Sequence, residues 1–195
     1  NSYQGEREAQ RWRARLAKLP ASGSPQAHVE TNFHLGVAEL FLGNEREAIK
    51  RLSEADELVS KMRGAPPEVV NPLKFRLGVA YLRLGETENC RQHHSAESCI
   101  LPIRGGGIHT LREGSTKALE YFGAVLRNAP AESQLYFEAL WLLNIAHMTL
   151  GQYPDAVPEQ YLIRAEARIH QGNLNGAMAD INVIRKRAGL ELLSS

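Results

Sequence analysis

Nine residues of the chain occur in two nearly identical copies, LGVAELFLG at Leu35–Gly43 and LGVAYLRLG at Leu77–Gly85. Self-similarity at a period of about 20–50 residues is typical of proteins built from stacked repeats, in which each unit contacts only its neighbours. Such arrays usually provide a surface that holds another molecule. The repeat therefore constrains the fold more than any other feature, and it favours a binding function.

The glycines of the two copies predict two different structural roles. Gly36 and Gly78 lie inside the motif, where the missing side chain lets a neighbouring helix approach closely. Gly43 and Gly85 close the motif, and we expect each to end a helix in a conformation with positive φ. A second helix is expected to pack under the first one through Ala48, Leu52 and Ala55.

The motif resembles the tetratricopeptide repeat, a helix–turn–helix unit of about 34 residues. The aromatic residue that this family carries after Leu-Gly is replaced by Glu39 in the first copy and is present as Tyr81 in the second. The small residue expected after the second copy is Cys90, and the pattern is lost at His94 and Glu97. The resemblance implies antiparallel helix pairs stacked into a solenoid.

The remaining chain continues the helical pattern. STKALEYFGAVLRNAP and LLNIAHMTLGQY have the spacings of single repeat helices, and YLIRAEARIHQGNLNGAMADINVIRKRAGL predicts a helix pair with a turn at Gly172-Asn173. Every proline, Pro72 included, is expected in a loop. Tyr136, Phe137 and Trp141 crowd one predicted helix, and we expect them to pack in the core.

The predicted fold is thus all-α, a single tetratricopeptide-like helical-repeat solenoid over residues 1–195. It divides into an N-terminal helix at 1–19, two clear repeats at 29–89, an irregular insertion at 90–114, and further helix pairs with a C-terminal cap at 115–195.

Composition excludes several classes of partner. A net charge of +1, with 23% charged residues, provides no global field that would attract nucleic acid. No apolar run approaches the roughly 20 residues that span a bilayer, so we expect no membrane insertion. The first residue is Asn1, which fits a removed signal peptide or a trimmed sequence.

The insertion, called here the 90–114 segment, contains both cysteines, three of the seven histidines and a run of three glycines. Long glycine-rich loops inside compact domains are usually functional. We therefore expect a site here.

Three readings of the cysteines remain open. An even number of cysteines in a possibly exported chain favours a Cys90–Cys99 disulfide, which would stabilise the loop by roughly 2–3 kcal/mol. Alternatively, both thiols are reduced, or they bind zinc or copper together with imidazoles. The ligand set would be Cys90, His93 or His94, Cys99 and His109. No other cofactor is expected.

The three glycines also have two readings. The backbone of Gly105, Gly106 and Gly107 can approach a ligand closely or form an anion-binding nest. The plainer reading is a turn, with His109 hydrogen-bonded to a neighbouring carbonyl group. Nothing in the spacing requires a nucleophile with a base in reach, so we predict that the protein is not an enzyme.

Three polar residues on predicted first helices are candidates for a binding groove. Asn32 and Lys74 each precede a motif leucine by three residues, and Asn144 lies on a later first helix. In arrays that bind peptides, such side chains clamp the backbone or carboxylate of the peptide.

Two further resemblances concern longer stretches. Residues of about 30–158 are similar to the repeat region of exported FG-GAP/ASPIC-UnbV proteins, through ENCRQHHSAESCILPIRGGGIHTLREGSTKALEYF and WLLNIAHMTLGQYPDAVP. Residues of about 160–190 resemble the C-terminal helices of SusD/RagB outer-membrane glycan-binding lipoproteins.

Both resemblances imply a periplasmic or secreted protein with a non-catalytic role as an interaction scaffold, which binds a partner segment in its concave groove. Two alternatives remain: a module for a metal or small ligand centred on the 90–114 segment, and a structural subunit that self-associates end to end.

Overall fold

The computed structural model describes residues 5–92, 95–153, 155–156 and 158–194. Within these residues the chain is helical and contains no strand, which confirms the predicted all-α helical-repeat fold. The chain forms two compact units, Asn1–Leu150 (unit 1) and Gly151–Ser195 (unit 2), whereas its repeat pattern predicts one domain. Unit 1 contains α1 (Gly5–Lys18), α2 (Pro25–Phe41), α3 (Glu45–Lys61), α4 (Pro67–Gln92), α5 (Glu113–Asn128) and α6 (Gln134–Thr149).

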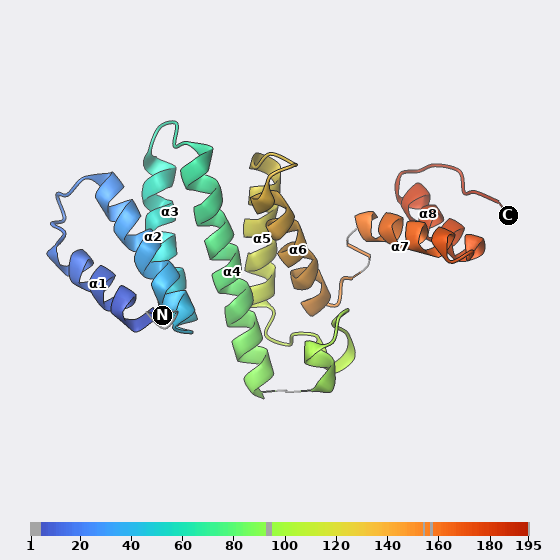
Figure 1. Cartoon of the computed structure of the whole chain (residues 1–195), viewed down its shortest axis with the longest axis horizontal. Coiled ribbons are helices and arrows are strands. Elements are labelled where there is room, and N and C mark those ends of the chain that lie inside the picture. Colours follow the sequence, from blue (N-terminus) through green and yellow to red (C-terminus); the bar gives the residue numbers. More distant parts are fainter. Residues whose placement is uncertain (1–4, 93–94, 154, 157, 195) are drawn as a thin grey trace. The chain divides into compact units, whose positions relative to one another are not determined.

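The helices of unit 1 form a one-dimensional stack. Each helix from α1 to α5 packs against the next helix in the chain. The first helices of successive helix pairs also contact each other, because α2 contacts α4 and α4 contacts α6. Figure 1 shows α1 to α6 side by side in chain order. This nearest-neighbour packing is the architecture of a repeat array.

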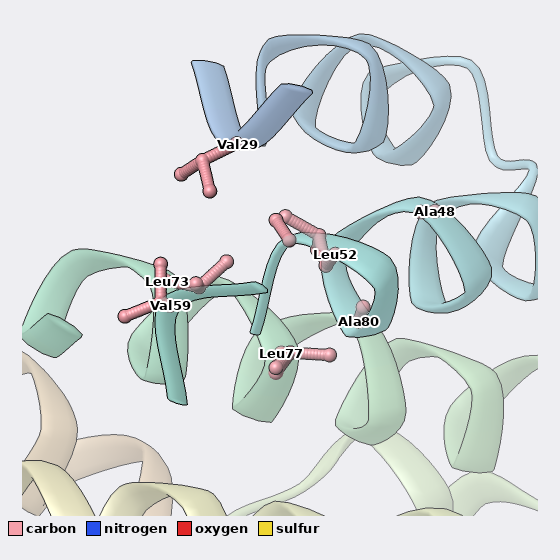
Figure 2. Close-up of a cluster of buried hydrophobic side chains, with 8 residues drawn as sticks. Val29, Ala48, Leu52, Val59, Leu73, Leu77 and Ala80 are labelled. Atoms are coloured by element: carbon pink, nitrogen blue, oxygen red, sulfur yellow. The ribbon is translucent and has the colours of Figure 1, made fainter. Parts of the chain in front are cut away.

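The motif glycines bring the helices of each pair together. A Cβ atom on Gly36 would lie 2.6 Å from Leu52 of α3, and one on Gly78 would lie 2.6 Å from Phe122 of α5. Ala48, Leu52 and Ala55 are fully buried, as predicted. Figure 2 shows Leu52 of α3 close to Leu73 and Leu77 of α4 in this core, with Val29 of α2 on its other side.

The predicted end of the second motif is wrong. Gly43 has φ +76° and ends α2, but Gly85 has no positive φ and lies inside α4, which continues to Gln92. Close packing explains the difference, because a Cβ atom on Gly114 of α5 would lie 2.6 Å from the backbone nitrogen of Gly85. Gly85 therefore serves helix contact rather than helix termination. Pro72 also lies within α4 and not in a loop.

A buried carboxylate joins α1 to the first repeat. Glu39 of α2 accepts hydrogen bonds from the Arg13 guanidinium at 2.6 and 2.7 Å and from Asn44 Nδ2 at 2.8 Å. Burial alone would raise the pKa of Glu39, but these hydrogen bonds and the charge of Arg13 outweigh it and hold the pKa below its ordinary value. The polar residue that replaces the aromatic of the repeat thus has a structural role.

Unit 2 is a helix pair, α7 (Pro158–His170) and α8 (Leu174–Arg187), with a turn at Gly172 as predicted. Tyr161, Ala165 and Ala177 are buried between the helices, whereas Ile169 is exposed. The buried Asp180 carboxylate accepts hydrogen bonds from Arg164 at 2.6 and 2.9 Å and from Arg168 at 2.7 Å. Arg164 and Arg168 are therefore paired inside the unit.

Candidate functional site

The 90–114 segment is anchored to the repeat array by Asn89 at the end of α4. Its Nδ2 donates to the carbonyl oxygens of Gly85 at 2.8 Å and Leu111 at 2.9 Å, and its Oδ1 accepts from the backbone nitrogen of Leu111 at 2.9 Å. The segment contains two short 3-10 helices, η1 (Ala96–Cys99) and η2 (Gly105–Gly107), which pack on each other. The carboxylate of Glu97 accepts from the backbone nitrogen of Gly106 at 2.6 Å. These hydrogen bonds join residues of the segment to one another and to α4.

His109 lies buried where this segment meets α5 and α6. Its Nδ1 shares a hydrogen bond of 2.9 Å with Ser115 Oγ, and its backbone nitrogen donates to the carbonyl oxygen of Thr149 at 2.8 Å. Burial lowers the pKa of His109, because the charged imidazolium is poorly solvated there. The geometry favours the plainer reading of His109 as a packing and hydrogen-bonding residue, with a hydroxyl as the partner of its ring.

The three glycines have close neighbours. Cβ atoms on Gly105, Gly106 and Gly107 would meet Glu97 Oε2 at 2.4 Å, Ser95 Oγ at 2.9 Å and the Glu97 carbonyl oxygen at 2.6 Å, respectively. Gly105 also has φ +55°. The glycines therefore allow η1 and η2 to pack together, which accounts for their presence without a ligand.

The disulfide and metal readings are not decided by the structure. His93, His94 and the side chain of Cys99 lie outside the described residues. Cys90 is half-buried on α4. No group of three or more His, Cys, Asp or Glu that could hold a metal ion occurs among the described side chains. The disulfide and the zinc or copper site both stay predictions.

Of the three groove candidates, Asn32 and Asn144 are buried and Lys74 is paired with a carboxylate. Asn32 and Asn144 are only 4% and 5% exposed. The Lys74 ammonium contacts Asp56 of α3 at 2.6 Å and lies 5.5 Å from the ring centroid of Tyr121 in α5. The groove role of these residues stays a prediction.

An apolar cleft opens instead between α2 and the first turns of α4. It has a volume of about 580 Å³, and the loop between α3 and α4 closes one side of it. Its lining is mostly apolar, with Glu30, His34, Arg63 and Glu68 as the ionisable members. The apolar lining residues are Val29, Phe33, Met62, Ala65, Pro66, Val69, Pro72 and Leu73.

The cleft lies between the first helices of two successive repeats, α2 and α4, where the repeat pattern predicts a groove. Its lining residues are not the predicted ones. The stretch MRGAPPEVVNP could have indicated the cleft from the sequence, because it combines apolar residues with a glycine and three prolines. In the structure Gly64 turns the chain with φ +71°, and the prolines lie on both sides of the start of α4. Large apolar pockets with few polar groups are the default location of a binding site.

Residues 158–195, which lie within unit 2, match the model of the SusD family. This supports the resemblance of the C-terminal helices to SusD/RagB proteins. No curated protein and no solved structure matches the chain. The comparisons do not confirm the tetratricopeptide and FG-GAP/ASPIC-UnbV resemblances, which stay predictions. None of the helices in the described part of the chain combines the length and apolar character that crossing a bilayer requires.

Proposed function

We propose that the protein is a non-catalytic interaction scaffold, and that the apolar cleft of unit 1 binds a segment of a partner protein. The observation that supports this proposal is the cleft itself, a preformed apolar hollow between two repeats. A folded monomer gains stability by filling such a space, so a hollow lined by Phe33, Val69 and Leu73 is best explained by an external apolar group.

The dimensions of the cleft define the chemistry of the partner. A volume of about 580 Å³ holds a short segment rather than a folded domain, and the apolar lining selects one or two large aliphatic or aromatic side chains. Glu30 is already paired with Arg15 at 2.7 Å, and the other carboxylate of the lining, Glu68, is exposed. We expect the bound segment to be apolar in the middle and not acidic beside it.

The match in unit 2 agrees with this role and suggests a location. The match to the SusD family is compatible with a binding protein and with an exported one, and we extend both properties to the chain as part of the proposal. The wider biological partner of the scaffold then lies outside the cytoplasm, in the periplasm or beyond.

The experiment is a selection of displayed random peptides against the full chain, with counter-selection against Val69→Asp. Val69 is 40% exposed in the first turns of α4, where a carboxylate suits the helix dipole, so the variant is expected to fold. Phe41→Asp is the matched control, because Phe41 is 78% exposed on α2 and does not line the cleft.

We expect selected peptides to share a large apolar residue and to lose affinity roughly tenfold or more on Val69→Asp, measured by fluorescence anisotropy. Phe41→Asp should bind them as the wild type does. Absence of any enriched peptide, or equal affinity for the Val69 variant, would contradict the proposal.

A further inference from the structure

One aromatic position recurs in three first helices of unit 1. The motif appears as LGVAELFLG in α2, LGVAYLRLG in α4 and LNIAHMTLG in α6, and the residue two places before its first leucine is Phe33, Phe75 and Trp141, respectively. The three side chains therefore occupy equivalent places on their helices.

The second of these aromatics, Phe75 of α4, is covered by α5, the second helix of its pair. Phe33 packs against the core formed by α2, α3 and α4. Phe75 is 7% exposed, and its ring centroid lies 5.9 Å from that of Phe122 in α5. In the α4–α5 pair the covering helix is the one that follows in the chain.

Trp141 has no such cover from the described residues of unit 1. It is 58% exposed, as is Phe137 one turn earlier on the same face of α6, so the predicted core packing of these two residues is wrong. Unit 1 ends at Leu150, directly after α6, and α6 is therefore a first helix without a second helix of its own in that unit. We call the surface formed by Phe137 and Trp141 the outer face of α6.

We propose that the outer face of α6 binds an amphipathic helix of a partner protein, which takes the place that α5 has on α4. The argument is continuity with the interfaces already present, because the same aromatic position binds a helix in α4. An open end of a repeat array exposes an apolar face that another element normally covers.

The two internal pairs define the chemistry of this partner helix. The second helix of each pair packs on the first one through three residues: a small residue, a large apolar residue four positions later and a smaller apolar residue three positions after that. In α3 these are Ala48, Leu52 and Ala55, and in α5 they are Ala118, Phe122 and Val125.

One residue restricts how far the partner helix follows α6. Asn144 replaces the glycine that admits Leu52 at Gly36 and Phe122 at Gly78, and it is 5% exposed. A helix therefore cannot approach closely at that turn, and contact is confined to the half of α6 that contains Phe137 and Trp141. Gly85 lies against Gly114 and Gly78 against Phe122, so paired helices run antiparallel. The partner is then expected to use the C-terminal half of its helix.

The test uses a synthetic peptide with the sequence of α5, because α5 is the helix that covers the equivalent aromatic. A side-chain cross-link between positions 116 and 120, both exposed in α5, keeps the labelled peptide helical. We expect saturable binding to the full chain by fluorescence anisotropy, weakened roughly tenfold or more by Trp141→Ala or Phe137→Ala. Phe41 is an even more exposed aromatic on α2, and Phe41→Ala should bind the peptide as the wild type does.

A peptide with Asp in place of Phe122 should not bind, since its apolar face is interrupted. No binding to the wild type, or binding unaffected by Trp141→Ala, would overturn the proposal. Growth of the mass with concentration in light scattering, abolished by Trp141→Ala, would also overturn it in favour of a second copy of the chain. Val69→Asp should leave this peptide's affinity unchanged, which separates the outcome from that of the apolar cleft.

Discussion

Gly114 of α5 lies so close to Gly85 of α4 that a Cβ atom on Gly114 would sit 2.6 Å from the Gly85 backbone nitrogen and 2.6 Å from the Tyr81 carbonyl oxygen. Two glycines thus set the distance between the helices of the second pair at the point where the 90–114 segment returns to the array. Backbone atoms cannot move aside as the end of a side chain can, so this contact tolerates no side chain.

We expect Gly114→Ala to destabilise the protein by about 1–3 kcal/mol or more, because overpacking against backbone forces the two helices apart. Urea unfolding followed by circular dichroism measures the change. Gly123→Ala in the same helix is the control, since its Cβ would meet only the end of the Arg127 side chain at 3.3 Å. That variant should be neutral or more stable by about 0.5–1 kcal/mol. Equal effects of the two changes would contradict the close-packing role of Gly114.

The Glu39–Arg13 pair makes a second prediction. Glu39→Gln removes a buried charge that two hydrogen bonds from a half-exposed guanidinium satisfy, and we expect a loss of about 1–3 kcal/mol at neutral pH. Glu30→Gln removes the exposed partner of Arg15 and should cost less than about 1 kcal/mol.

The same pair predicts a pH dependence. The pKa of Glu39 is lower in the folded than in the unfolded chain, so its contribution is present above the unfolded pKa and is lost as pH falls through the folded pKa. The difference in unfolding free energy between wild type and Glu39→Gln should therefore shrink below about pH 4. A difference that stays constant down to pH 3 would show that the charge of Glu39 is not what stabilises the contact.

The sequence predicts the role of a residue well when the contacts of that residue lie within one repeat, and poorly when they involve a segment distant in sequence. Gly36 and Gly43 follow the expected pattern, because each has one role in the first pair. Gly85 stands at the equivalent place to Gly43, but its role depends on Gly114, which the 90–114 segment separates from it in sequence. A glycine that ends a helix and one that admits a neighbour are indistinguishable until that neighbour is known.

The exposure of Trp141 has the same cause. Its helix has the repeat pattern that buries Phe75, yet burial needs a covering helix, and the pattern alone does not show whether unit 1 contains one. The apolar cleft likewise depends on the path of the α3–α4 loop, which periodicity does not predict. The helices were therefore predictable from the repeat, whereas the surfaces between and beyond them were not.

His109 gives a third prediction, at mildly acid pH. Burial holds its pKa below the ordinary value of 6.5, so the unfolded chain binds more protons between the folded and the ordinary pKa. The stability of the protein should accordingly rise with pH through this interval and level off above about pH 7. We expect His109→Gln to reduce this dependence, because Gln keeps a hydrogen bond to Ser115 and does not titrate.

Unfolding free energies at several values between pH 5 and pH 7.5 provide the measurement, with His170→Gln as the control. His170 is exposed at the end of α7, in the other compact unit, so its replacement is a matched histidine substitution away from the His109 contacts. A slope that is identical in wild type and His109→Gln would contradict a neutral, buried His109.

In unit 2 the buried Asp180 is expected to be decisive for stability. Asp180→Asn weakens the hydrogen bonds to both Arg164 and Arg168, and a unit of this size has little apolar core to offset a loss of about 2–4 kcal/mol. Hydrogen exchange should show α7 and α8 losing protection, while α2 to α5 keep theirs. Glu166→Gln, at an exposed position of α7, is the matched control.

The last prediction concerns the two cysteines. We expect the mass of the oxidised chain to be lower by two hydrogens than that of the reduced chain, which would establish the Cys90–Cys99 disulfide. Reduction should then lower the stability by roughly 2–3 kcal/mol, because it frees a short loop in the unfolded state. Hydrogen exchange should report the change in η1 and η2, with α5 less affected.

Native mass spectrometry separates the other readings in the same experiment. A native mass higher by one zinc or copper ion, lost on denaturation to leave two free thiols, would contradict the disulfide and make the 90–114 segment a metal site. Two free thiols without added mass would contradict both. In that case the Asn89 hydrogen bonds to Gly85 and Leu111 hold the segment on α4 without a covalent link. Asn89→Ala should then lower the hydrogen-exchange protection of η1 and η2 as much as we expect reduction to do for a disulfide-linked chain.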